Sequence, residues 1–185
     1  MAITTTHEKF MHELGDIYDA EHRFLKGQQE MRRHATDPQL QGLLQEHIQQ
    51  SEQQTRNLEQ VFQLLGQPAK AEKCDAAQGL VTEAQKTMKE AEVDALRDCL
   101  IGSSATKVEH YEIASYRGLI TGAQLMGQQK VVTLLQQNPQ QEEQAAQRLE
   151  QSAPHLLRQA MQAEGTQEKG LPTETRQASQ TMTRP

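Results

Sequence analysis

Residues 109–116 read Glu-His-Tyr-Glu-Ile-Ala-Ser-Tyr, and this octapeptide places two carboxylates on the apolar side of a predicted helix. The helix is expected over residues 94–121, because apolar side chains recur there at the spacings of one helical face. Its inner face is predicted to hold Leu96, Leu100, Ser103, Thr106, Glu109, Glu112, Ile113, Tyr116 and Leu119. Burying a carboxylate among apolar side chains is costly unless the charge is neutralised. The octapeptide therefore indicates a chemical role for Glu109 and Glu112.

Two helices are expected ahead of this one, and each carries a polar side chain on its apolar face. Residues 6–34 place Glu21 on a stripe of apolar and aromatic side chains, and residues 38–65 place His47 in a row of leucines. Between them, Asp37 and Pro38 supply a helix cap and a first-turn proline. The two helices are therefore predicted to form a hairpin.

Residues 66–93 are polar, broken in pattern and longer than a hairpin requires, with a short helix expected from Val81. Ferritin-like bundles use such a long crossover to make their second and third helices parallel. A fourth helix is expected from about residue 128 with Glu142 on its inner face, and Pro139 either kinks this helix or opens a fresh one behind Asn138.

The fold predicted from these patterns is all-α. It is a ferritin-like four-helix bundle over residues 1–163, with a long crossover between helices 2 and 3 and a short extra helix. Residues 164–185 are almost devoid of apolar side chains, so burial cannot repay the entropy of ordering them. They are predicted to form a disordered polar tail.

Composition excludes several classes of partner. The 185-residue chain has a net charge of -6 and no run of Lys and Arg interleaved with aromatic residues, so nucleic-acid binding is not expected. No stretch reaches the roughly 18 apolar residues of a membrane span, and residues 1–10 lack the apolar core of a signal peptide. Cys74 and Cys99 fit no zinc or disulfide pattern. These features predict a soluble, cytoplasmic protein that binds no membrane.

Polar donors lie on the inward faces of all four predicted helices: Glu21, His47, Glu109, Glu112 and Glu142. Counted from the helix ends, their levels agree to within about one turn if the fourth helix is continuous and kinked. Carboxylates that converge in a low-dielectric interior repel one another unless cations neutralise them. Because oxygen and imidazole donors without thiolates favour iron or manganese, the five residues are predicted to bind one of these metals.

Each donor also has a plainer interpretation. A glutamate near the inner face can pair with an arginine such as Arg23 or Arg56, and a histidine there can be a hydrogen-bonded core residue. Tyr18 and Tyr116 lie one turn from proposed ligands and either hydrogen-bond them or pack with an anchored hydroxyl.

Four stretches of the sequence resemble the YciE/YciF-type family of ferritin-like proteins. They are Asp16-x-Tyr18-x-Ala20-Glu21, Leu58-Glu59-x-Val61-Phe62-x-x-Leu65-Gly66, Lys73-Cys74 with Gly79-Leu80, and Glu109-His110-Tyr111-Glu112-Ile113-Ala114-x-Tyr116. The resemblance covers residues 7–160 and implies a rubrerythrin-like four-helix bundle, usually dimeric and associated with bacterial stress responses. It also implies a two-metal site at Glu21, His47, Glu109, Glu112 and Glu142.

The fourth helix departs from the pattern of this family. Gln141 precedes Glu142, and Ala146 stands where an aspartate is expected. A typical ferritin-like two-metal site uses four Glu and two His, so the set here is reduced. His110, Ser51 or a water molecule is a candidate to complete the coordination.

Two functions follow. The first is a di-iron or di-manganese carboxylate protein that reacts with peroxide or dioxygen, or oxidises Fe(II), in a stress response. The alternative is a metal-free bundle that acts as a stress-induced scaffold or interaction partner, which the missing acid at Ala146 favours. Catalytic residues are not assigned, and iron is not distinguished from manganese because both accept the same donors.

Overall fold

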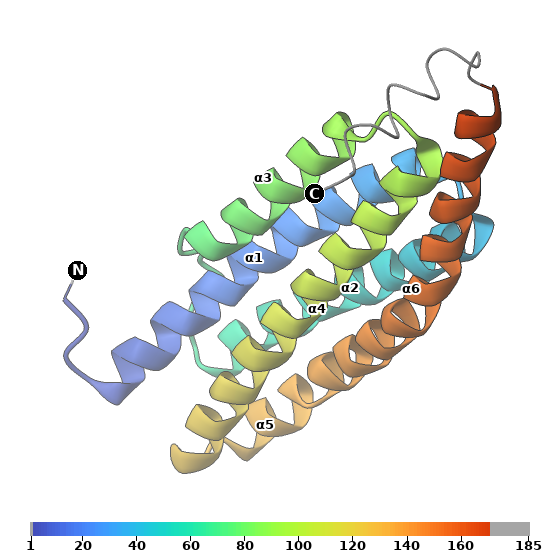
Figure 1. The fold of residues 1–185 in the computed structure, drawn as a ribbon. Helices are drawn as coiled ribbons and strands as arrows, with labels where there is room; N and C mark the ends of the chain where they lie inside the picture. The colour runs from blue at the N-terminus through green and yellow to red at the C-terminus, as the bar shows by residue number, and fades with distance from the viewer. Residues whose placement is uncertain (1, 171–185) are drawn as a thin grey trace, which may run out of the picture.

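The chain forms a bundle of four long helices with two shorter ones at its side and end (Figure 1). The computed structural model describes residues 2–170. Its elements are α1 (Thr6–His34), α2 (Pro38–Leu64), α3 (Asp75–Glu90), α4 (Asp94–Leu125), α5 (Gln129–Leu135) and α6 (Gln137–Gly170). This part of the chain contains no strand, so the predicted all-α class is confirmed.

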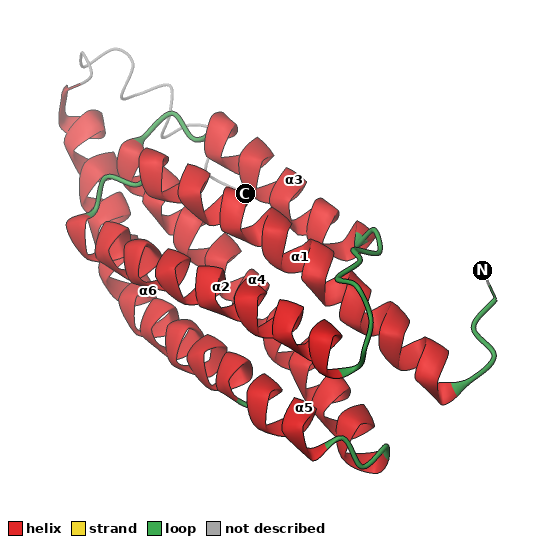
Figure 2. Cartoon of the chain, turned by 180° about the vertical axis from the view of Figure 1, so that it is seen from behind, coloured by secondary structure: helices red, strands yellow, loops and turns green. Residues whose placement is uncertain are grey.

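The topology is the predicted ferritin-like one. Helices α1 and α2 form the expected hairpin, and α2 and α4 then run in the same direction, as Figures 1 and 2 show. The crossover that reverses the chain contains α3, which packs on the outer side of α1 and α4. The most extensive contact in the bundle joins α4 to α6. In the described part of the chain, no helix is both long and apolar enough to cross a membrane.

The crossover lies directly on α1. The amide of Glu72 donates to the carbonyl of Gly15 at 3.0 Å, and a Cβ at Gly15 would come within 2.9 Å of the backbone carbonyl of Lys70. Helix α3 then begins at Asp75, capped by Cys74, whose Sγ accepts from the amide of Ala77 at 3.3 Å. The expected start at Val81 is therefore wrong, because this cap and the contacts of α3 with α1 and α4 form earlier in the chain.

The final helical region is interrupted at one residue. Helix α5 ends at Leu135 and α6 starts at Gln137, so the segment is continuous apart from a break at Gln136. Pro139 lies in the first turn of α6, where its missing N–H leaves no hydrogen bond unmade. Helix α6 extends to Gly170, so residues 164–170 are helical and not part of a tail. The rest of the predicted tail, 171–185, lies outside the described residues.

The first half of α4 faces the core differently from the prediction. Ser103 is exposed, and Leu96, Leu100 and Thr106 are half-buried. The buried face instead carries Asp98, Ile101, Gly102, Ala105 and Val108. A Cβ at Gly102 would lie 3.1 Å from Cδ1 of Leu156, so small side chains line the close approach of α4 to α6. Hydrophobic periodicity does not reveal such a face, because several of its side chains are small or polar.

Asp98 ties the start of α4 to the turn between α1 and α2. Its carboxylate accepts from the amide and hydroxyl of Thr36 at 2.8 and 2.6 Å and from the amide of Asp37 at 2.8 Å. Asp37 in turn caps α2 by accepting from the amide of Leu40 at 2.8 Å. One end of the bundle is therefore fixed by hydrogen bonds to two buried carboxylates.

Two separate apolar clusters make up the core. One includes Phe10, Phe24 and Tyr116, and the other includes Met31, Ile101 and Leu149. Glu21, His47, Glu109 and Glu112 each lie between members of the two clusters on their own helix, and Glu142 lies between Leu135 of α5 and Leu149 of α6. The bundle therefore contains a buried polar layer with apolar packing on either side.

We expect Gly15→Ala and Gly118→Ala to change stability in opposite directions. At Gly15 the added methyl meets backbone and must displace the crossover, which should lower the free energy of unfolding by about 1–3 kcal/mol. Gly118 also lies inside a long α-helix, α4, but a Cβ there meets nothing within 4 Å. Alanine at this position should raise the free energy of unfolding by about 0.5–1 kcal/mol. Urea denaturation of the two variants measures both changes, and equal effects would contradict the close approach at Gly15.

Candidate metal centre

Four buried side chains from three helices bring donor atoms together in the middle of the bundle. His47 comes from α2, Glu109 and Glu112 from α4, and Glu142 from α6. One ligand atom from each lies within 4.8 Å of every other. Glu109 and Glu112 are three residues apart, which puts both on one face of α4. These four are the predicted donors that the fold assembles into a single group.

Glu21, the fifth predicted donor, is fully buried on α1 beside this group but does not share its mutual distances. Its Oε1 accepts a short hydrogen bond from the hydroxyl of Tyr116. Its carboxyl also faces that of Glu112, and the two can hydrogen-bond only if one is protonated. Glu21 thus flanks the four-residue cluster on the α1 side.

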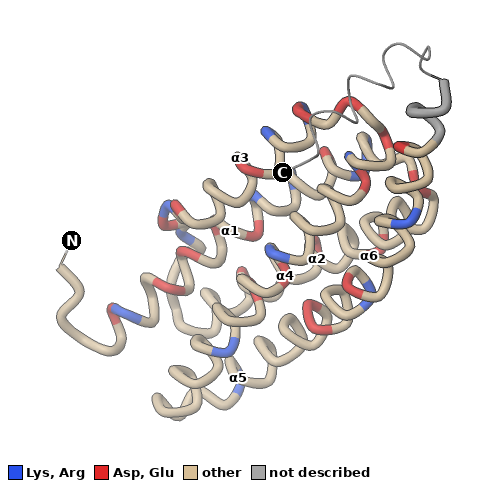
Figure 3. Tube along the Cα trace, viewed as in Figure 1, with Lys and Arg blue, Asp and Glu red and all other residues tan. Residues whose placement is uncertain are grey.

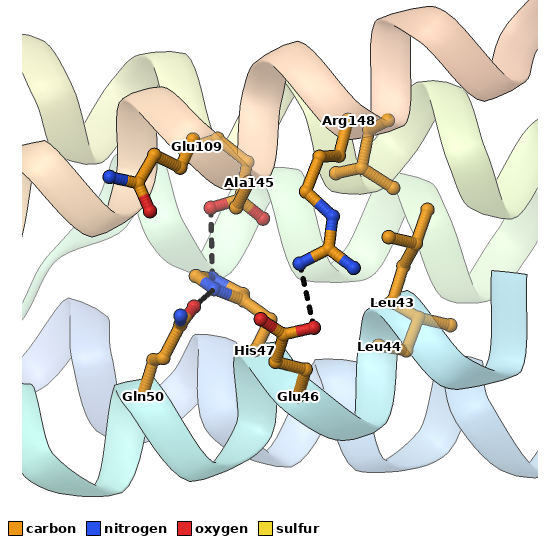
Figure 4. Close-up of a pocket in the computed structure, with 10 residues that line it drawn as sticks. Leu43, Leu44, Glu46, His47, Gln50, Glu109, Ala145 and Arg148 are labelled. Carbon is orange, nitrogen blue, oxygen red and sulfur yellow. Dashed lines mark hydrogen bonds and ion pairs between the residues drawn. The ribbon is translucent and has the colours of Figure 1, made fainter.

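His47 has a defined orientation, shown in Figure 4. Its Nδ1 lies 3.1 Å from Oε1 of Gln50, and because a carboxamide oxygen only accepts, Nδ1 carries the proton. In the neutral ring, Nε2 is then a bare lone pair, 2.8 Å from Oε2 of Glu109 and 3.3 Å from Oε2 of Glu142. A lone pair facing two carboxylates is repulsive, so a proton or a cation is needed between them.

Burial dominates the ionisation of the four glutamates. It raises the pKa of Glu109 to about 7 and, together with the charge of Glu142, that of Glu21 to about 8. Burial and neighbouring carboxylates also raise the pKa values of Glu112 and Glu142. Without a cation, protons must therefore neutralise the layer near neutral pH.

Unless protons are shared within the cluster, many of its buried polar atoms have no hydrogen-bond partner. They are Oε2 of Glu21, both carboxyl oxygens of Glu109 and Glu112, Oε2 of Glu142 and Nε2 of His47. Buried polar groups are normally paired, and each unpaired one costs roughly 1–3 kcal/mol. Carboxylate oxygens with one imidazole nitrogen are ligands that iron and manganese accept. The donor set therefore fits a metal ion at this position.

Arginine does not neutralise the layer. Arg23 pairs with Asp19, and Arg56 hydrogen-bonds Gln53 at the surface. His110 is exposed and pairs with Glu150 at 2.9 Å, whereas the Ser51 hydroxyl donates to Gln28 at 3.0 Å, so neither completes the cluster. Ala146 is buried and offers no donor. The cluster is thus limited to the imidazole and the glutamates.

Hydrogen-bonding side chains that the sequence analysis did not assign to the site surround this layer. The amide of Gln54 donates to Glu142 and, at 3.1 Å, to Gln141. Asn57 donates to Asn138 at 2.8 Å within the same interior. Gln54 is seven residues after His47, so its place on the inner face of α2 was a readable signal. Tyr116 hydrogen-bonds Glu21, as one alternative predicted, while Tyr18 bonds Glu59 at 3.1 Å instead of a ligand.

Comparison with known proteins identifies relatives of this chain. It is 32% identical to protein YciF of Escherichia coli K12 over 143 residues, which cover 77% of this chain and 86% of that protein. The solved structure of the E. coli stress protein YciF matches with a TM-score of 0.80 at 29% identity, covering 84% of this chain and 99% of that one.

Two other solved structures are similar. YcfI from Rhodopseudomonas palustris, described as a candidate structural protein, matches at 36% identity with a TM-score of 0.79, covering 80% of this chain and 94% of that one. A protein from Xanthomonas campestris shares the fold at 21% identity, with a TM-score of 0.71 over 87% of this chain and 99% of that one. Residues 5–162 match the family described as domain of unknown function DUF892, and the chain belongs to this family, which is represented by YciF-type stress proteins.

Proposed function

We propose that this protein is a metalloprotein whose buried layer of glutamates and one histidine holds iron or manganese, and that it acts on peroxide or dioxygen in a stress response. The observation that supports this most is the convergence of His47, Glu109, Glu112 and Glu142 within 4.8 Å, with most of their donor atoms otherwise unpaired. These four residues would hold one ion. Glu21, on the α1 side, would help Glu112 and Glu142 to hold a second ion.

The chemistry required is the transfer of electrons to a small oxidant. Two bound Fe(II) or Mn(II) ions, each oxidised by one electron, would supply the two electrons needed to reduce one hydrogen peroxide molecule to two water molecules with uptake of two protons. Gln50 keeps Nε2 of His47 directed at the carboxylates, and Gln54 orients Glu142. The hydroxyl of Tyr116 holds Glu21 and can pass or retain a proton there. The surrounding apolar clusters exclude bulk water.

A metal-free scaffold is the second candidate, because part of the polar interior is paired without a cation. Asn57 bonds Asn138, and Ser51 bonds Gln28. YcfI, which is similar to this chain, is described as a candidate structural protein. In that function the glutamates would remain protonated. The homodimer and the cytoplasmic location stay predictions under either function.

Metal binding should be visible in both composition and thermal stability. After anaerobic loading with Fe(II) or Mn(II) and removal of free metal, we expect about one to two ions per chain by elemental analysis. An ion present at about 100 times its dissociation constant adds about 2.7 kcal/mol, which for this size corresponds to roughly 5–10 °C in Tm. A chelator should reverse the rise.

The matched variants are His47→Ala and His110→Ala. The first removes the buried imidazole of the cluster, whereas the second removes an exposed one that pairs with Glu150. We expect loss of the metal-dependent rise in Tm only in His47→Ala. A wild-type protein that retains no metal, or two variants that respond alike, would favour the scaffold.

Glu21→Gln should separate one-ion from two-ion binding. The amide has nearly the same shape and keeps an oxygen for the Tyr116 hydroxyl, but it removes one negative charge from the α1 side. We expect the amount of bound Mn(II) to fall from about two ions per chain to about one. Unchanged binding of two ions would mean that Glu21 takes no part in holding the second.

The metal-free protein should lose stability as pH rises from about 5 to about 8. Glu21 and Glu109 have folded-state pKa values near 8 and 7, above the ordinary value of 4.5. The folded state therefore binds more protons than the unfolded state across this range, and its advantage is lost as the pH rises through the folded pKa values. Bound metal replaces these protons, so the gain in Tm on loading should increase with pH. Urea denaturation across this range tests the sign, and a stability that increases with pH in the metal-free protein would contradict it.

A further inference from the structure

A small pocket between α2 and α6 is lined by exposed side chains and by members of the buried cluster (Figure 4). It is a cavity of about 20 Å³, which is room for about one water molecule. His47 and Glu109 line its inner part. Glu46 and Arg148, from α2 and α6, line its outer part, where they form an ion pair of 2.6 Å.

His47, which lines this pocket, is the most exposed member of the cluster. The side chain of His47 is 6% exposed, whereas those of Glu109 and Glu142 are 1% and 0% exposed. The outer ion pair is far more open, with side-chain exposures of 49% for Glu46 and 47% for Arg148. A gradient from half-exposed to buried side chains therefore runs along the pocket.

The ion pair closes the pocket only weakly. Solvent screens an exposed pair of this kind, so it breaks and re-forms readily. Once it breaks, the two side chains affect a cation in opposite ways, because the carboxylate of Glu46 attracts it and the guanidinium of Arg148 repels it. Further into the pocket, the carboxamide oxygen of Gln50 or Gln144 can replace a water molecule around a passing ion. The ion would then reach the ligands His47 and Glu109.

We infer that this pocket is the entry route for divalent cations to the buried cluster, with the Glu46–Arg148 ion pair as its gate. The inference rests on the proposed metal-binding function. It adds that loading is limited by a charged mouth and by a cavity that has room for about one water molecule. Charge at the mouth changes the rate at which an ion enters, as it does for other charged ligands. The amount of metal bound at equilibrium is set by the ligands of the cluster.

The test is the rate of Co(II) uptake by metal-free protein, followed by stopped-flow visible absorbance. We expect Arg148→Gln to speed loading and Glu46→Gln to slow it, each by about threefold to tenfold at low salt, with smaller effects at high salt. Both variants break the same ion pair, so a purely structural role would move both rates in the same direction. Opposite changes in the two loading rates would therefore show that the charges of Glu46 and Arg148 control entry.

The matched control is the pair Arg117–Glu143, which joins α4 to α6 at 2.9 Å and is also exposed. Arg117→Gln should load at the wild-type rate. A second variant, Ala145→Leu, places a larger side chain in the lining of the pocket and should slow loading by about tenfold, since an ion must push that side chain out of its rotamer. Ala114→Leu, at an exposed position of α4, controls for the added bulk.

Equilibrium and rate measurements keep the two ideas apart. Equilibrium binding of Co(II) tests the proposed function, and all pocket variants should reach the wild-type amount. If Co(II) binds but Glu46→Gln, Arg148→Gln and Ala145→Leu load like the wild type, the route is wrong and the metal centre stands. Equal shifts in both charge variants would likewise overturn the gate, as expected if breaking the ion pair acts only on the local structure. A wild-type protein that binds no Co(II) refutes both.

Discussion

Repulsion among four glutamates enclosed in one layer of the bundle is the constraint on which the rest of the structure depends. Glu21, Glu109, Glu112 and Glu142 are each 0% exposed, and burial raises the pKa of each. In a low-dielectric interior such charges cannot coexist unbalanced. The layer is therefore destabilising until protons or cations enter it, and the remainder of the bundle must hold the helices together around it.

Several features of the fold meet that requirement. An apolar cluster lies on each side of the layer, and at one end the carboxylate of Asp98 fixes the α1–α2 turn to α4. The crossover is bound to α1 through Gly15, so α3 covers the outer side of α1 and α4. Lys, Arg, Asp and Glu residues are distributed along all the long helices (Figure 3), and apart from Asp37 and Asp98 most of the other charged side chains in the described chain are at least partly exposed. Stability therefore comes from regions away from the layer, which leaves the layer free to serve a chemical purpose at a cost in stability.

The helices and the donors were readable from the sequence for one reason: in a bundle of long helices, apolar periodicity reports which side chains face inward. Glu109 or His47 is conspicuous in such a pattern because it interrupts an apolar row. Contacts between distant segments leave no such periodic trace. Asp98 faces inward to bind a turn some 60 residues earlier, and Gly102 faces inward so that α4 can approach α6, so the inner face of the first half of α4 was predicted wrongly. The start of α3 was missed for the same reason.

Charge balance bears on the absence of a carboxylate at Ala146. The four buried glutamates carry four negative charges when ionised, and two divalent cations neutralise them without a remaining proton. A fifth carboxylate would leave the layer one negative charge in excess. One cation bound by His47, Glu109, Glu112 and Glu142 would still leave oxygens of Glu21, Glu109 and Glu112 unpaired. A second cation on the α1 side would engage those oxygens, so the reduced ligand set accommodates two ions. His47 would bind an ion through Nε2 while its Nδ1 donates to Gln50, and a bound imidazole adds a donor without changing the charge balance.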